Sequence, residues 1–199
     1  KGSLPPAATR AEQAVMFAAA EKWLNDRGYK RLSNCHWAKD IRERSMYNIL
    51  AKTGADVFPF GCGAGGFVGQ YSTMQMRDLE KYITMIDEGK KPIMVMSGKS
   101  PYDEVHKKIS QNMEQGYLDL RGITAENPEL VQLEYILNIW LKNGLMRKGE
   151  VMYFQTQAGR FWQNNLTQSL LECCEYILSQ GKIKEAKPMQ GMDGKHVSA

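Results

Sequence analysis

The chain has 199 residues, of which 43% are hydrophobic and 24% are charged, and its net charge is +4. These values are ordinary for a globular protein of one large or two small domains. No apolar run approaches the roughly 18 residues that a membrane-spanning helix needs. The N-terminus shows neither a secretory signal nor an initiator methionine. We therefore expect no membrane partner, a cytoplasmic location and a natural chain longer than this one.

The charge is distributed unevenly along the chain. Residues 1–100 carry 15 Lys and Arg against 10 Asp and Glu, whereas residues 101–199 carry 11 against 12. Proteins that bind duplex nucleic acid cluster cations against the phosphates, so we expect no nucleic-acid partner for the second half. Six cations between Arg27 and Arg44 could instead receive an anionic ligand, or they could form a solvated face.

The cysteines show no spacing that indicates a metal site. Cys35, Cys62, Cys173 and Cys174 form no C-x-x-C pair, and a chain of this size needs no disulfide framework. Zinc and iron–sulfur sites are usually built from such local pairs or triplets. We therefore expect no metal to be bound by this chain alone. We interpret the four thiols as buried and inert, although Cys35 and Cys62, at the ends of predicted strands, could instead form a reactive pair.

In the first hundred residues the spacing predicts helices and short extended segments. Thr9 is placed to cap a helix that ends near Gly28, with apolar residues recurring every four positions. Extended runs follow at 29–35 and 57–60, and the second leads into a glycine-rich loop at 61–66. Leu79, Ile83 and Ile86 mark another helix, after which residues 93–96 form an apolar stretch.

Beyond Pro101 the pattern is mainly helical. Apolar spacing predicts helices over 105–113 and 130–141, a hairpin over 145–155 and a last helix that Thr156 caps. Helix, hairpin and helix in this order are typical of a winged helix. Residues 181–199 are polar and without a period, so we expect a disordered tail.

The loop 61–66, Gly-Cys-Gly-Ala-Gly-Gly, has three interpretations. It matches G-x-G-x-x-G, which holds the pyrophosphate of a nucleotide in an oxidoreductase when a helix opens directly after it. Here residues 67–72 intervene before helical spacing begins, which weakens that interpretation. The glycines could simply form a tight turn. At the C-terminal end of a barrel strand the same loop would hold a ligand.

Four segments, in chain order, resemble the oxygen-independent coproporphyrinogen III oxidase superfamily of radical S-adenosylmethionine (SAM) enzymes. Residues 34–39 (Asn-Cys-His-Trp-Ala-Lys) resemble its strand-end His-aromatic-Ala motif, and residues 55–66 with 71–75 resemble its strand and glycine-rich loop. Residues 77–82 follow its D/E-L-x-x-Y pattern. Residues 141–145 and 156–162 resemble the "NGL" and "T-x-x-G-R" of its C-terminal domain. The Gly-Ala-Gly-Gly form is most similar to the heme-utilisation branch, whose members open the heme ring without oxygen.

This resemblance implies an α+β fold in three parts. Residues 1–100 would be the terminal β/α units of a partial (β/α) barrel that carries the glycine-rich loop. Residues 101–180 would be a mostly helical, winged-helix-like domain, followed by the tail 181–199. The family's cluster-binding C-x-x-x-C-x-x-C is absent from the sequence. The 4Fe-4S cluster and most SAM contacts of the full enzyme would thus lie outside this chain, which alone would be inactive.

The resemblance also assigns roles to individual residues. SAM would contact Gly61, Gly63, Ala64, Gly65, Gly66 and Val68. Heme or a porphyrinogen would contact His36, Trp37, Arg42 and Arg44, because guanidinium groups bind carboxylates in bidentate fashion. His36 is also the candidate catalytic proton donor, although a lone histidine is often only structural. The full enzyme would need a reductant such as flavodoxin, and its reaction could be heme ring opening with methyl transfer or coproporphyrinogen III decarboxylation.

Two alternatives concern the C-terminal part of the chain. A winged helix can be a DNA-binding or interaction module, but residues 159–179 contain Arg160 as their one cation against Glu172 and Glu175. That composition favours a packing module. In the tail, Met189, Met192 and His196 are possible heme ligands, or they are incidental residues of a disordered segment.

Overall fold

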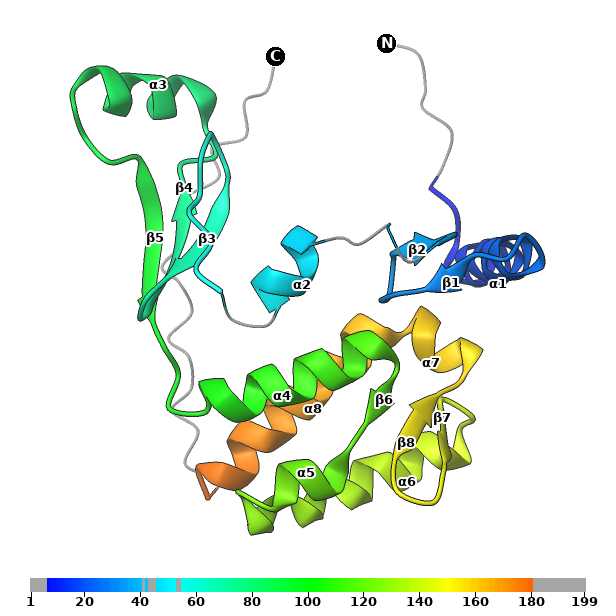
Figure 1. Ribbon diagram of the computed structural model, residues 1–199. Helices are drawn as coiled ribbons and strands as arrows, with labels where there is room; N and C mark the ends of the chain where they lie inside the picture. The colour runs from blue at the N-terminus through cyan, green and yellow to red at the C-terminus, as the bar shows by residue number, and fades with distance from the viewer. Residues whose placement is uncertain (1–6, 41, 43–45, 53–54, 181–199) are drawn as a thin grey trace.

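A computed structural model describes residues 7–40, 42, 46–52 and 55–180, and it confirms the α+β class (Figure 1). Helix α1 (Arg10–Asp26) precedes a hairpin of β1 (Lys30–Arg31) and β2 (Trp37–Ala38). A short helix α2 (Met46–Lys52) leads to a three-stranded sheet of β3 (Gly65–Val68), β4 (Tyr71–Gln75) and β5 (Ile93–Gly98). Helix α3 (Leu79–Asp87) connects β4 to β5.

The second half has the element order of a winged helix. It runs α4 (Asp103–Gln115), β6 (Tyr117–Leu118), α5 (Leu120–Thr124), the 3-10 helix η1 (Pro128–Leu133) and α6 (Glu134–Lys142). The hairpin β7 (Met146–Lys148) and β8 (Tyr153–Gln155) then leads to α7 (Gln157–Phe161) and α8 (Gln163–Leu178). The sheet order is β6-β8-β7, and both pairings are antiparallel. The predicted hairpin and the helix over 105–113 are confirmed. The predicted helix over 130–141 divides into η1 and α6, and the last predicted helix divides into α7, which Thr156 caps, and α8. The elements β6 and α5 were not predicted.

The winged-helix order also corrects which helix would read DNA. In a helix-turn-helix the second helix of the pair enters the groove, and here that position belongs to α6 rather than to the last helix. Glu134 and Lys142 are the charged residues of α6. One cation balanced by one acid is not the clustered positive charge that phosphates attract.

Helix α1 begins as the sequence predicts but buries an unexpected residue. Thr9 Oγ1 accepts a hydrogen bond from the Glu12 amide at 3.3 Å, and Glu12 Oε2 accepts one from the Thr9 amide at 2.7 Å, which completes a capping box. The predicted apolar stripe is open, with Val15 70% and Trp23 52% exposed. The buried side of α1 carries Glu21 instead, which is 4% exposed.

The sheet in the first half differs from the predicted β/α units. β3, β4 and β5 pair antiparallel, whereas successive strands of a β/α barrel are parallel. The extended run 57–60 contributes only a bridge between Val57 and Phe67, because Pro59 has no N–H to continue a ladder. The strand begins inside the glycine-rich segment, at Gly65, and the run 29–35 shortens to Lys30–Arg31.

The hydrophobic core lies in the second half of the chain. Among the described residues, all but one of the buried hydrophobic side chains fall between Val105 and Cys174, the exception being Ala38. Ile109, Met113, Leu118, Leu137 and Leu170 are completely buried there. Residues 101–180 therefore have a core of their own. Within the described part of the chain, no helix combines the length and apolarity that crossing a membrane requires.

The turn before the hairpin and the start of α7 hold each other in place. Thr156 Oγ1 accepts from the Gly159 amide at 3.1 Å, which caps α7, and donates to the Gly144 carbonyl at 2.6 Å. A Cβ on Gly159 would lie 2.0 Å from the Leu145 carbonyl oxygen, so only glycine allows this approach. The "NGL" and "T-x-x-G" segments thus meet in space and form a structural clamp.

Arg160, which follows that clamp, joins the two halves of the chain. Its Nε and one terminal nitrogen donate to the carboxylate of Glu21 at 2.5 and 2.8 Å, and Gln157 Nε2 adds a third bond at 3.1 Å. The side chains of Glu21 and Arg160 are 5% and 24% exposed. Phe17 and Phe161 pack beside the pair, with ring centroids 5.7 Å apart. Helix α1 is therefore held against α7 by a largely buried ion pair.

The ion pair sets the pH dependence of this contact. Desolvation by burial would raise the pKa of Glu21, but hydrogen bonds from Arg160 and Gln157 and the charge of Arg160 lower it below its usual value. A carboxyl whose pKa is lower in the folded state stabilises the fold above its unfolded-state pKa of about 4.3. That stabilisation is lost as the pH falls through the lower, folded-state value.

We predict that Glu21→Gln releases α1 from α7. Removing one partner of a buried pair leaves Arg160 uncompensated, so docking should weaken by about 3 kcal/mol at pH 7. Amide hydrogen exchange in α1 should accelerate about 100-fold, since each 1.4 kcal/mol is a factor of ten. The difference from the unmodified protein should shrink below about pH 4. Asp26→Asn is the matched control, because the Lys22–Asp26 pair on the same helix is exposed and such pairs contribute little. Equal exchange in both variants would contradict the assignment.

Candidate functional site

His36 lies in a tight loop that its own backbone and a serine hold closed. The His36 carbonyl accepts from the amides of Leu32 and Ser33 at 2.8 and 3.3 Å. Ser33 Oγ lies 2.6 Å from His36 Nδ1, and Cys35 Sγ lies 3.8 Å from the same nitrogen. The ring is half-buried, and Trp37 begins the short strand β2. This arrangement fixes the orientation of the imidazole, as a proton donor requires.

Helix α4 contacts this loop through Glu114. The Asn34 amide donates to Glu114 Oε1 at 3.2 Å, and Gln163 Nε2 donates to Glu114 Oε2 at 3.1 Å. Arg31 also reaches α4, with a terminal nitrogen 3.5 Å from the Gln115 carbonyl. Burial lowers the pKa of Arg31, and the positive charge of Arg160 adds to that effect, while Glu21 and Glu114 oppose it. The His36 loop is thus anchored on the C-terminal domain.

Of the two arginines predicted to bind carboxylates, Arg42 lies on the surface. Its side chain is 89% exposed, and it pairs with Asp40 at 3.2 Å. Its backbone amide also donates to Asp40 at 2.8 Å. Arg44 lies outside the described residues, as do Met189, Met192 and His196. The carboxylate-binding role of Arg42 and Arg44 stays a prediction.

The glycines of the loop 61–66 have different structural roles. Gly61 and Gly63 adopt positive φ angles of 97° and 72°, which glycine tolerates best. The Gly63 amide donates to the Met76 carbonyl at 2.8 Å, and the Gln75 amide donates to the Ala64 carbonyl at 2.8 Å. These bonds extend the β3–β4 ladder at the end opposite its turn. The prediction that Cys35 and Cys62 are buried is wrong, because both lie in exposed loops. The Cys62 thiol donates to the Arg77 carbonyl at 3.3 Å.

Gly65 and Gly66 stand next to each other in β3 but differ in their surroundings. A Cβ on Gly66 would lie 2.3 Å from the Val57 carbonyl oxygen and 2.5 Å from Pro59 Cδ. A Cβ on Gly65 would meet nothing closer than the Thr73 carbonyl oxygen at 3.9 Å. Backbone packing therefore accounts for Gly66, and positive φ accounts for Gly61 and Gly63. Neither reason applies to Gly65.

The strand β3 also contacts α4, through Phe67. Lys99 Nζ and Lys107 Nζ lie 5.3 and 5.5 Å from the Phe67 ring centroid, within cation–π range. Asp103 pairs with both lysines, at 3.8 and 3.0 Å. A hydrogen bond from Lys107 to Asp103 raises the pKa of that lysine. Nothing in the sequence singled out these four residues, because their contact depends on how the sheet meets α4.

The His36 loop and the glycine-rich strand do not meet directly. Figure 1 shows the β1–β2 hairpin and the β3–β5 sheet on opposite sides of α2, which itself contacts α4. Both segments instead reach α4, one through Glu114 and the other through Lys107. These residues are seven positions apart, or about 10 Å along a helix. Helix α4 therefore fixes the spacing between the two segments that the sequence predicted to be functional.

A polar cleft of about 390 Å³ runs between these two anchor points, where α4 and α8 lie side by side. Lys107, Glu114 and Gln163 line it, with hydroxyl and amide side chains between them. Gln163 is 2% exposed, and no group in the described part of the chain hydrogen-bonds its Oε1 atom. Burial lowers the pKa of His106 in the same cleft, although Glu175 and Asp103 oppose this.

Comparison with known proteins supports the resemblance that the sequence motifs indicated. No family model matches the chain. It is 33% identical over 179 residues to the anaerobilin synthase of Escherichia coli O157:H7, a match that covers 89% of this chain and 39% of the relative. This match supports the resemblance to the oxygen-independent coproporphyrinogen III oxidase-like superfamily, and within it to a C-terminal part of the heme-utilisation branch.

A solved structure shows the same fold. The chain superposes on coproporphyrinogen III oxidase of Escherichia coli, described as a radical SAM enzyme, with a TM-score of 0.62 and 15% identity. The match covers 82% of this chain and 42% of the oxidase. The chain thus spans about two fifths of the length of both relatives, and at this identity the second comparison establishes the fold alone.

We predict that the two neighbouring glycines of β3 respond differently to alanine. Gly66→Ala places a methyl group against the backbone of Val57 and Pro59, so the sheet should lose about 1–3 kcal/mol of stability. Gly65→Ala is the matched control and should change stability by less than about 0.5 kcal/mol, because its Cβ has room. Amide exchange of β3 and β4 measures both effects. A stable Gly66→Ala sheet would show that Val57 does not pack there.

Proposed function

We propose that this chain is the C-terminal portion of a radical SAM enzyme that acts on heme or a porphyrinogen. The observation that carries the proposal is the 33% identity to an anaerobilin synthase across 89% of the chain. Of the two reactions that the sequence left open, this relative favours SAM-dependent heme ring opening over coproporphyrinogen decarboxylation. The role of this portion would be to enclose the substrate and to complete the SAM pocket.

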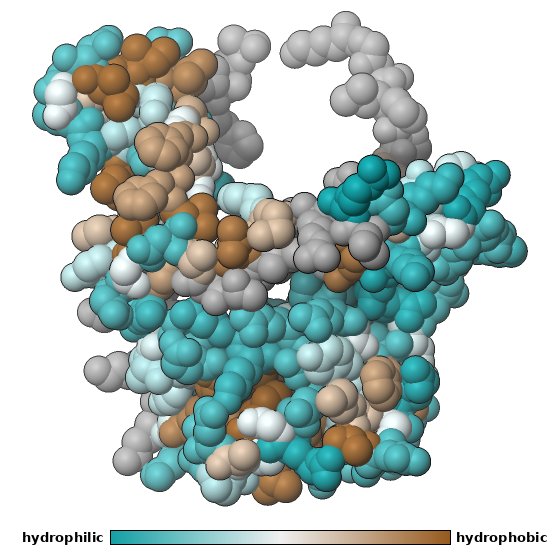
Figure 2. Space-filling view, viewed as in Figure 1, coloured by the Kyte–Doolittle hydropathy of each residue, from teal (hydrophilic) through white to brown (hydrophobic). Residues whose placement is uncertain are grey.

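The exposed apolar faces of the first half support the proposal that another part of the enzyme packs against them. Large hydrophobic side chains are exposed on the helices of this half and on the β3–β5 sheet: Val15, Met16 and Trp23 on α1, Met46, Tyr47 and Leu50 on α2, Leu79, Ile83 and Ile86 on α3, and Phe58, Phe60, Tyr71, Val95 and Met96 in or near the sheet. Figure 2 shows several of them gathered over the sheet and α3, above a hydrophilic band over α4. Contiguous apolar surface of this extent normally lies in an interface. We propose that the cluster-bearing part of the barrel packs there.

The described residues do not fit an iron–sulfur cluster. In the ranges that the structure describes, no three Cys, His, Asp or Glu side chains come together as a metal-binding group. Cys35 and Cys62 lie at the surface on separate elements, whereas Cys174 is buried in α8, where burial raises its thiol pKa to about 11. A cluster ligand must be a thiolate. We therefore assign the cluster to the cysteine-bearing portion and derive no step from it here.

Gly65 is the residue of this chain best suited to contact SAM. Neither a positive φ angle nor close packing within the chain requires glycine at this position. Backbone without a side chain lets a ligand approach closely. When bound, SAM supplies the radical that begins the chemistry of this superfamily. Gly61, Gly63, Ala64 and Gly66 would shape the backbone around that contact. Val68, half-buried at the end of β3, would line its apolar side.

The His36 loop is the proposed tetrapyrrole side of the site. His36 is held at Nδ1 by Ser33, which orients the ring so that it can move a proton to or from the substrate. Trp37 offers an aromatic surface next to it. The reductant, a flavodoxin or a similar one-electron donor, would act on the cluster-bearing portion.

Activity of the full-length enzyme tests the proposed reaction. We expect anaerobic incubation of the reconstituted protein with SAM, reductant and heme to release 5′-deoxyadenosine and to consume heme. Coproporphyrinogen III under the same conditions should be spared. The 199-residue chain alone should do neither. Consumption of coproporphyrinogen III with heme left intact would replace the proposed substrate while keeping the enzyme class.

We predict that Gly65→Val in the full-length enzyme lowers turnover at least 100-fold. The β-branched side chain should occupy the space that SAM needs, while its backbone conformation is tolerated because φ at Gly65 is not positive. Gly98→Val is the matched control, since a Cβ on Gly98 in β5 of the same sheet meets nothing within 4 Å. Both variants should melt like the unmodified enzyme. Normal SAM cleavage by Gly65→Val would show that the loop faces away from the chemistry, and its SAM-binding assignments would then be withdrawn.

A further inference from the structure

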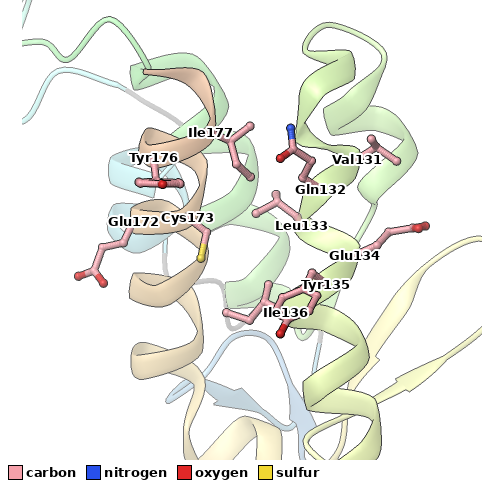
Figure 3. Close-up of a pocket in the computed structure, with 10 residues that line it drawn as sticks. All are labelled: Val131, Gln132, Leu133, Glu134, Tyr135, Ile136, Glu172, Cys173, Tyr176 and Ile177. Carbon is pink, nitrogen blue, oxygen red and sulfur yellow. The ribbon is translucent and has the colours of Figure 1, made fainter. Parts of the chain in front are cut away.

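An apolar groove lies on the C-terminal domain, outside the site described above. It runs between the last two turns of α8 and the junction of η1 with α6, and its volume is about 700 Å³ (Figure 3). Leu133, Ile136, Cys173 and Ile177 point into it from the two sides. Leu133 is 1% exposed and belongs to the core, so the floor of the groove is the core itself.

The walls of the groove expose large side chains to solvent. Tyr135 is 78% exposed, Tyr176 59% and Val131 51%. Aromatic and aliphatic side chains around a hollow of this size are typical of a surface that receives an apolar segment. This groove shares no lining residue with the polar cleft between α4 and α8.

The charge of the groove restricts what can fill it. Among its lining residues, Glu134 and Glu172 are acidic and none is Lys or Arg. A tetrapyrrole would bring its carboxylates against these acids, which repel them. An apolar segment that carries cations would pack against the apolar floor and pair with the acidic residues of the rim.

The chain itself provides such a segment directly after α8. Residues 181–199 contain four lysines against Glu185 and Asp193, and their apolar residues include Ile183, Met189 and Met192. Methionine is flexible and fills irregular apolar hollows well. The composition of the segment therefore complements a groove with an apolar floor and an acidic rim.

The end of α8 puts that segment within reach of the groove. The helix ends at Leu178, next to the groove residue Ile177, and Gln180 then adopts a left-handed φ of 53°. A left-handed residue after a helix turns the chain away from the helix axis. Residues 172–177 span only about 7.5 Å of helix, while six extended residues reach about 20 Å.

We propose that residues 181–199 dock in this groove, with their apolar side chains on its floor and their lysines beside Glu134 and Glu172. Tethering gives such a segment an effective concentration of about 1 mM. An intrinsic dissociation constant near 0.1 mM then suffices to fill the groove about 90% of the time. The inference is independent of the reaction that the full enzyme catalyses.

Cys173 is a natural reporter of this docking. Its thiol points into the groove in Figure 3, and burial with the charge of Glu172 raises its pKa. Cys35 and Cys62 are exposed elsewhere, and Cys174 is buried beside it. The alkylation rate of Cys173 with iodoacetamide, measured by mass spectrometry, thus reports whether the groove is covered. The rates of the other three cysteines serve as internal references.

The test compares the intact chain with one that ends at Gln180. We expect truncation to raise the alkylation rate of Cys173 about ten-fold and to leave Cys35 and Cys62 unchanged. Met189→Asp with Met192→Asp in the intact chain should have a similar effect, whereas the paired Met→Leu changes should not. A synthetic peptide of residues 181–199 should protect the truncated chain again. Because α8 ends before Gln180, truncation leaves the core intact, and the melting temperature should fall by only about 2–4 °C, the loss expected when a bound segment is removed.

Three results would overturn the proposal. An unchanged Cys173 rate after truncation would mean that the tail does not cover the groove. Protection that grows with protein concentration and survives truncation would assign the groove to a second copy of the chain. Protection of the truncated chain by heme, but not by the peptide, would make it a tetrapyrrole site.

Discussion

The contact between Glu21 and Arg160 is the constraint on which the arrangement of this chain depends. The two residues are 139 positions apart, and their halves of the chain have very different means of support. Residues 101–180 fold around a core of their own, whereas the first half buries few side chains. A charge that is taken out of water must be paired, so Glu21 can be buried only where Arg160 and Gln157 stand. This requirement gives α1 one preferred position on the C-terminal domain.

Helix α4 fixes the two segments of the candidate site on the C-terminal domain. Glu114 near its C-terminal end binds the backbone of the His36 loop, and Lys107 near its N-terminal end lies against Phe67 of the glycine-rich strand. The two segments that resemble family motifs therefore never need to touch. Their separation is set by two turns of a helix whose other face, with Val105, Ile109 and Met113, is locked into the core. Rigid support of this kind is what substrate enclosure needs, because small displacements of positioning groups reduce catalysis strongly.

The sequence predicted the C-terminal domain better than the N-terminal half for a physical reason. In residues 101–180 the apolar periodicity is satisfied inside the chain, so the helices of Ile109, Leu137 and Leu170 lie where the spacing predicted them. In α1 and α3 the same periodicity was detected correctly, yet Val15 and Ile83 are exposed. No described residue covers these two side chains, and we proposed above that the cluster-bearing part of the barrel does so. The β/α units that the family resemblance implied were wrong in their pairing, since β3, β4 and β5 are antiparallel. The residues of a strand do not specify the direction of the strand beside it.

The sequence alone indicated the resemblance to the superfamily, the helix caps at Thr9 and Thr156, the hairpin over 145–155 and the segments proposed to carry the site. These features depend on residues close together in the chain, so the local sequence suffices to predict them. Only the tertiary structure decided that Glu21 pairs with Arg160 and that Phe67 lies under Lys99 and Lys107. It also separated Gly66, which is required by the Val57 backbone, from Gly65, which has open space. Each of these decisions joins residues from different elements, and local propensity carries no information about such contacts until packing has brought the elements together.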